Sequence, residues 1–147
     1  MKRIVLLMTG LLMTVLAACQ PSNSGITIDS VCEYLREEGY LPEKLDAQAA
    51  CFKSEGDTYL IGVSNEKGWV GISATWRIST DQVQKLYRSA AKVMDEKIMV
   101  QIIVDEEDSS VTFALQQFCD SMSDYKRYFK RWLGILVSAS SECLYQL

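Results

Sequence analysis

Apolar residues recur at helical spacing in three separate stretches of this chain. The stretches are Ile28–Glu38, Thr80–Glu96 and a segment that starts near Ser121 and continues towards the C-terminus. Apolar residues repeated every three or four positions are typical of a helix that buries one face, so we expect three amphipathic helices. Ser79 and Ser121 are placed to cap the second and third helices. For the first helix, Ser30, Thr27 or Asp29 can serve as the cap.

Alternating apolar and polar residues predict five strands between these helices. The ranges are Ala49–Ser54, Thr58–Ser64, Trp69–Trp76, Ile98–Val104 and a last strand that contains Val111, Phe113 and Leu115. Short turns separate the strands within each group, and such connections require antiparallel neighbours. We therefore expect an α+β fold for residues 28–147. It is a two-layer sandwich in which a five-stranded, mostly antiparallel sheet carries helices on one face, in the order α-βββ-α-ββ-α.

The second face of the predicted sheet is partly apolar. The side chains that alternate with the inward-facing positions include Leu60, Trp69, Met99, Ile103 and Ala114. An open sheet face of this composition is typical of a protein interface. In the alternative interpretation, the long third helix or the connector between the first helix and the first strand covers these residues. Periodicity does not decide between the two.

The chain begins with a secretory signal pattern. Lys2-Arg3 precede the apolar run Ile4–Ala18, which ends in small residues and is shorter than the ~20 residues of a membrane-spanning helix. Leu16-Ala17-Ala18-Cys19 resembles the lipobox of bacterial lipoproteins. The resemblance implies cleavage of residues 1–18, a diacylglyceryl group on the Cys19 thiol and acylation of the new amino terminus. The alternatives are a conventional signal with an incidental cysteine and a retained hydrophobic anchor.

Residues 19–27 then form the lipidated cysteine and a short tether. Gln20–Gly25 is polar and rich in turn-forming residues, and it reaches ~20 Å when extended. The domain at residues 28–147 is therefore expected close to a membrane. Gln20 is not the aspartate that is linked to inner-membrane retention, which favours the outer membrane.

Charge and residue types restrict the chemistry. The full chain carries a net charge of −4, and removal of Lys2 and Arg3 with the leader lowers it to −6. A modestly acidic domain does not attract nucleic acid through its overall field. The chain has no histidine, which excludes Ser-His and Cys-His nucleophile systems within it. No phosphate-binding glycine loop occurs, so we expect no cofactor.

Two clusters of charge stand out. Asp105–Asp108 is a dense acidic turn, which is either a calcium site or a solvated hairpin turn, and it lacks the spacing of known calcium loops. Lys126, Arg127, Lys130 and Arg131 form a basic patch near the start of the third helix, where the helix dipole disfavours cations. The acidic turn, anionic lipid headgroups or an acidic partner can compensate them. Alternatively, they are simply the solvated side of the helix.

Four cysteines follow Cys19 in the chain. An even number in an exported protein permits disulfides, and four cysteines allow three pairings. These cysteines, Cys32, Cys51, Cys119 and Cys143, also lie at or beside apolar stretches, where a thiol behaves as a small hydrophobic group. None has the C-x-x-C spacing of a zinc site. Both interpretations stay open.

The predicted element order, together with two short segments, resembles the YbjN family. The segments are Phe52–Gly56, which leads into the first hairpin, and Ile102–Val111 with its acidic turn. That family is similar in fold to the type III secretion chaperones. The resemblance implies a compact domain that dimerises or binds a partner segment, with no catalytic residues to carry over.

The leading hypothesis is a lipid-anchored, non-enzymatic binding or adaptor domain of a bacterial cell envelope. It binds the membrane through Cys19 and a protein partner, or another copy of itself, through the sheet face or helix surface. The second hypothesis is an envelope enzyme that uses carboxylates such as Asp105 or Glu107 with Tyr or Lys partners. The third is a purely structural envelope lipoprotein.

Overall fold

The computed structural model describes residues 25–64, 67–97, 99–145 and 147. The helices are α2 (Ile28–Glu37), η2 (Thr80–Gln82, a 3-10 turn), α3 (Val83–Glu96) and α4 (Met122–Leu144). The strands are β1 (Glu43–Lys44), β2 (Ala49–Ser54), β3 (Asp57–Ser64), β4 (Trp69–Arg77), β5 (Val100–Asp105) and β6 (Ser110–Phe118). In the described part of the chain, no helix is both long and apolar enough to cross a membrane.

The predictions for the leader lie outside the described residues. These are the signal peptide at residues 1–18, the lipidation of Cys19 and the first part of the tether. They remain predictions. Ile98, predicted as the start of a strand, also lies outside the described residues, and β5 begins at Val100.

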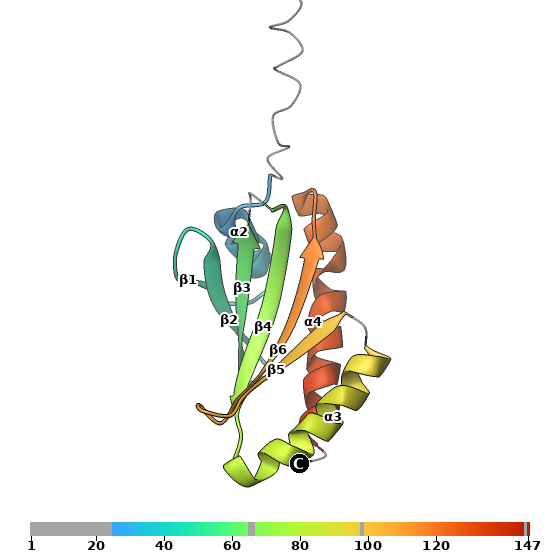
Figure 1. Cartoon of the computed structure of the whole chain (residues 1–147). Helices are drawn as coiled ribbons and strands as arrows, with labels where there is room; N and C mark the ends of the chain where they lie inside the picture. Colours follow the sequence, from blue (N-terminus) through green and yellow to red (C-terminus); the bar gives the residue numbers. More distant parts are fainter. Residues whose placement is uncertain (1–24, 65–66, 98, 146) are drawn as a thin grey trace, which may run out of the picture.

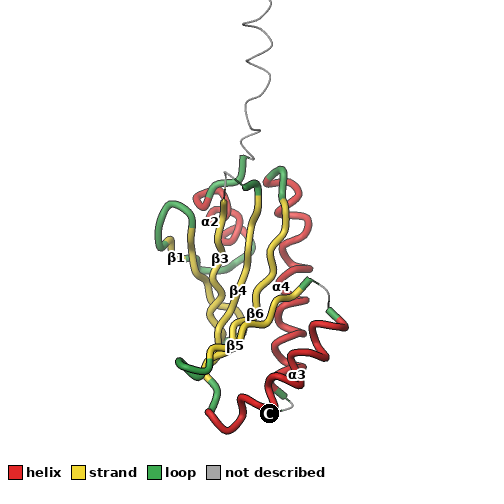
Figure 2. The backbone as a smooth tube through the Cα atoms, viewed as in Figure 1, coloured by secondary structure: helices red, strands yellow, loops and turns green. Residues whose placement is uncertain are grey.

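The six strands form one antiparallel sheet in the order β1-β2-β3-β4-β6-β5 (Figure 2). The predicted α+β class and two-layer arrangement are confirmed, but the sheet has six strands and not five. The additional strand is β1, in which Glu43 pairs with Cys51 and Lys44 with Ala50. Both β1 side chains are exposed, so this two-residue strand leaves no apolar alternation in the sequence.

The core lies between the helices and one face of the sheet. Alternate residues of every long strand point into it, and they include Phe52, Ile61 and Phe113, each almost fully buried. Full burial of such a side chain stabilises the fold by roughly 1.5–3 kcal/mol. Helices α2 and α4 lie against this face, and α3 packs along α4 and β5 (Figure 1). The helices therefore leave the opposite face of the sheet uncovered.

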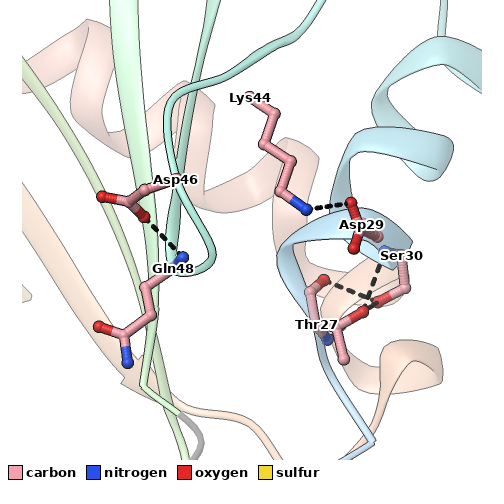
Figure 3. A network of polar contacts seen from close by, with 6 residues as sticks. All are labelled: Thr27, Asp29, Ser30, Lys44, Asp46 and Gln48. Carbon is pink, nitrogen blue, oxygen red and sulfur yellow. Dashed lines mark hydrogen bonds and ion pairs between the residues drawn. The ribbon is translucent and has the colours of Figure 1, made fainter.

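Side-chain caps fix the starts of the helices. In α2 the cap is Thr27, whose Oγ1 accepts the backbone N–H of Ser30 at 3.2 Å, while Ser30 Oγ accepts the backbone N–H of Thr27 at 3.0 Å. Nearby, Lys44 Nζ lies 2.6 Å from the carboxylate of Asp29 and joins β1 to α2 (Figure 3). Ser121 caps α4, as predicted, by accepting a backbone N–H of the first turn at 3.2 Å.

The four cysteines after Cys19 are free thiols. Cys32, Cys119 and Cys143 are buried in the core, and Cys51 is half-buried on β2. Burial raises the pKa of the Cys143 thiol to about 11, and it also raises the pKa of Cys32 and of Cys119. The structure therefore follows the interpretation in which these residues act as small hydrophobic groups.

Candidate functional site

The candidate site is the open face of the sheet, which is the face towards the viewer in Figure 1. Leu60, Trp69, Ile103 and Ala114 lie on it, because they alternate with the buried residues of their strands. Leu60 is 44% exposed and Ile103 is 56% exposed. The alternative in which α4 or the connector covers them does not hold. Helix α4 packs on the opposite face, and the connector forms β1 at the edge of the sheet.

Phe118 joins this face and was missed by the sequence reasoning. It is the last residue of β6, pairs with Trp69 of β4 and is 83% exposed. The alternation after Ala114 continues through Gln116 to Phe118, so the signal was present in the sequence. The open face thus holds two neighbouring aromatic side chains at one end of the sheet.

The Trp69 ring lies over two glycines. Gly62 of β3 and Gly71 of β4 face each other across the sheet. A Cβ atom built on Gly71 would stand 3.1 Å from Cζ3 of Trp69, and one built on Gly62 would stand 3.8 Å from the same atom. The glycines therefore leave the space that the indole occupies. A shallow hollow of about 160 Å³ adjoins the ring, with Leu60 and Ala114 among its walls.

Charged side chains on the open face lie at its β1 edge, where Glu43 pairs with outward-facing Cys51, and at its far end. By alternation, those at the far end are Lys53, Arg77 and Asp105, at or next to the last residues of their strands. The other outward-facing positions of β2 to β6 are uncharged. Among them, the hydroxyls of Thr75 and Thr112 are hydrogen-bonded to each other at 2.8 Å across β4 and β6. The centre of the face is therefore apolar to weakly polar and electrically neutral.

Met99 lies apart from the four residues with which it was predicted to project. Because β5 begins at Val100, the strand alternation does not extend to Met99, which belongs to the preceding turn. It lines an open hollow of about 420 Å³ near the end of α3 and the middle of α4, together with Arg131 and Ile135. Met99 therefore lies beside α3 and α4 and not on the open face.

Two of the basic residues of α4 pair with the end of α2. Lys126 Nζ lies 2.9 Å from Glu37, and Lys130 forms an ion pair with Glu38. The Lys130 ammonium lowers the pKa of the Glu38 carboxyl. These acids, and not the acidic turn, compensate the cations near the start of the helix. Exposed pairs of this kind contribute roughly 0–1 kcal/mol each, so they position α2 on α4 more than they stabilise the fold.

The two arginines of the patch make no ion pair with any described residue. The Arg127 guanidinium lies 5.8 Å from the ring centroid of Tyr128. Arg131 contributes to the wall of the hollow beside Met99. The predicted basic patch is therefore divided into two paired lysines and two exposed arginines.

The acidic turn is organised by its own backbone. Asp105 Oδ1 accepts the backbone N–H groups of Glu107 and Asp108, each at 3.0 Å. The carboxylate of Glu106 accepts the hydroxyl of Tyr87 at 2.8 Å. In the described ranges, no group of three or more Cys, Asp and Glu side chains could hold a metal ion. The calcium interpretation gains no support from this geometry, which is that of a hairpin turn.

The carboxyls in ion pairs do not resemble general acids. A general acid needs a carboxyl whose pKa is raised, as burial in an apolar cleft does. Hydrogen bonding to Lys130 lowers the pKa of Glu38, and hydrogen bonding to Lys97 lowers that of Glu142. Both carboxyls lie at the surface, and neither adjoins the open face of the sheet.

Comparison with solved structures gives the same fold. The crystal structure of YbjN from E. coli, described as a candidate transcription regulator, has a TM-score of 0.60 and 13% sequence identity, covering 79% of this chain and 87% of that one. An uncharacterised protein from Methanothermobacter thermautotrophicus has a TM-score of 0.59 and 15% identity, covering 80% and 93%. No protein-family model and no curated protein matched the chain. At these identities the likeness shows a YbjN-like fold alone.

Proposed function

We propose that this chain is a lipid-anchored, non-enzymatic binding domain of a bacterial cell envelope that holds a protein partner on the open face of its sheet. The observation that carries the proposal is the exposure of the apolar side chains of Leu60 and Ile103 on that face, with Trp69 and Phe118 at one end of it. Covering such side chains is favourable by roughly 25 cal/mol for each Å² of apolar surface removed from water. An apolar patch with a polar surround is typical of an interaction site.

The shape and charge of the face favour a protein over other ligands. Its hollow of about 160 Å³ is smaller than the ~300 Å³ at which small-molecule pockets begin. Its centre has no cation to bind phosphate. The mature chain is acidic as well, so we do not extend to it the regulation of transcription suggested for the E. coli neighbour. A flat, neutral, partly apolar surface suits another protein surface.

The anchor is proposed from the lipobox-like segment that ends at Cys19, with the outer membrane as the favoured location. We expect the wild-type protein to carry acyl groups on Cys19 and to fractionate with membranes. In Cys19→Ser the acyl mass disappears, because the thiol that receives the diacylglyceryl group is gone. Intact-mass spectrometry and membrane fractionation measure both. Unchanged processing and membrane association in the variant would remove the anchor from the proposal.

Photo-crosslinking in cells tests the binding face. A photo-reactive residue is placed at Leu60 or Ile103, and at Gln84 or Lys92 on the exposed side of α3 as matched controls. We expect a protein adduct from both sheet positions and none from the helix positions. Adducts to a second copy alone would favour the structural alternative. Equal adducts from all four positions, or none from the sheet, would refute the binding face and favour the enzyme hypothesis.

A further inference from the structure

Several features meet at one end of the sheet. The described chain begins there at Gly25, β3 is followed there by β4, and β6 is followed there by α4 (Figures 1 and 2). Trp69 is the first residue of β4 and Phe118 the last of β6, so this aromatic pair lies at the same end. The backbone N–H of Cys119 donates to the carbonyl of Gly68 at 3.1 Å. This hydrogen bond joins the residue before β4 to the residue after β6.

Apolar exposure and charge are distributed unequally between the two ends of the domain. Phe118 is the more exposed member of the pair, with 83% of its surface in contact with solvent, and its exposed neighbours Lys67 and Asp120 have opposite charges. The acidic turn Asp105–Asp108 lies at the opposite end (Figure 1). Anionic lipid headgroups repel carboxylates, so the dense acidic turn disfavours the approach of a bilayer to the opposite end.

The length of the chain before the described residues limits where a bilayer can lie. Cys19 precedes Gly25 by six residues, which reach at most ~20 Å. A lipid on Cys19 therefore keeps this end of the domain, and not the acidic end, close to the membrane. Tethering also raises the effective concentration of the bilayer at this end, so that a small contact surface is sufficient.

We infer that this end docks on the lipid bilayer, with Phe118 entering the headgroup region and Trp69 beside it at the interface. The inference rests on the lipid anchor of the proposed function. Trp favours the membrane interface because its ring is largely apolar but carries a polar N–H group, and the apolar ring of Phe is favoured at the boundary of headgroups and acyl chains. In this orientation the strands extend away from the bilayer, and the open face is roughly perpendicular to the membrane plane. Leu60 and Ile103 stay accessible to a protein partner in this orientation.

Fluorescence quenching tests the docking. The mature, lipidated protein is placed in phosphatidylcholine vesicles with or without a nitroxide quencher on the headgroup, and co-sedimentation is measured on the same samples. The emission of Trp69 is obtained by comparing wild type with Trp69→Phe. We expect the quencher to reduce the wild-type emission, and this reduction to be lost in Trp69→Phe and in Phe118→Asp. Ile103→Asp, on the same face but away from this end, is the matched control and keeps the quenching.

The outcomes separate docking from anchoring. Protein that sediments with the vesicles but shows no quenching of Trp69 overturns the docking and leaves the anchor intact. Protein that does not sediment with them overturns the anchor, and the docking with it. Full quenching in Phe118→Asp overturns the role of Phe118. Far-UV circular dichroism confirms that each variant is folded, as expected because Phe118 and Ile103 are exposed.

Discussion

The hydroxyl of Tyr125 is buried without a hydrogen-bond partner among the described residues. Its removal is therefore predicted to change the free energy of unfolding. Tyr125 is 1% exposed, and its ring packs against Tyr34, Phe129 and Trp132 at centroid distances of 5.7, 5.5 and 6.0 Å. Tyr125→Phe keeps all three ring contacts and removes only the hydroxyl. A buried polar group without a partner costs about 1–3 kcal/mol, so we expect the free energy of unfolding to rise by about 1 kcal/mol or more.

Tyr34→Phe is the matched control. The Tyr34 hydroxyl donates to the backbone carbonyl of Lys126 at 3.3 Å, so Tyr34→Phe removes a hydrogen bond that the folded protein makes. We expect that variant to lose about 0.5–1.5 kcal/mol, the net value of a typical hydrogen bond. Urea unfolding followed by circular dichroism measures both variants against wild type. If Tyr125→Phe is destabilised as much as Tyr34→Phe, the Tyr125 hydroxyl has a partner and the reasoning is refuted.

The same tyrosines predict an alkaline loss of stability. Burial raises the pKa of Tyr125, and burial with the nearby Glu38 raises the pKa of Tyr34 to about 12. The unfolded chain releases these protons near the ordinary tyrosine pKa of ~10 and the folded chain only at higher pH. The free energy of unfolding therefore falls as the pH rises above ~10. We expect a shallower fall in Tyr125→Phe, and an equal slope in both proteins would contradict the assignment.

Two further predictions concern the open face and the thiols. Gly71→Ala places a Cβ 3.1 Å from the Trp69 ring and is expected to destabilise the protein by about 1 kcal/mol or more, as overpacking does. In Gly134→Ala the new Cβ, inside α4, meets nothing within 4 Å, and the variant is expected to stabilise the protein by about 1 kcal/mol. Urea unfolding measures both glycine variants, and equal effects of the two on the free energy of unfolding would contradict the account. In the folded protein, iodoacetamide is expected to alkylate half-buried Cys51 before Cys143, which is buried and has a pKa raised to about 11. Peptide mapping would contradict this if Cys143 reacted as fast.

Local signals predicted most of the fold. The range of β2, Ala49–Ser54, follows from its alternation, and the start of α4 follows from Ser121 as a cap. Both signals depend on residues a few positions apart, so they are visible in the sequence. The predicted strand number was wrong because of Glu43–Lys44, where two exposed polar residues pair with β2 without any apolar pattern.

Contacts between distant segments could not be predicted in the same way. Glu37 and Lys126 are 89 positions apart, and only the packing of α2 against α4 brings them together. Alternation selected Leu60 and Ile103 for the second face of the sheet. Whether α4 would cover that face was not decidable from periodicity, because both arrangements satisfy the same pattern. Met99 was predicted on this face because the predicted strand began at Ile98, whereas β5 begins at Val100.

The central claim is that the open face of the sheet binds a protein. The most direct measurement is the amount of crosslinked partner recovered from cells that express Leu60→Asp or Ile103→Asp, compared with Gln84→Asp on the exposed side of α3. The account predicts loss of the partner in the two sheet variants and full recovery with the helix variant, at equal levels of lipidated protein. Equal recovery from all three variants would contradict it.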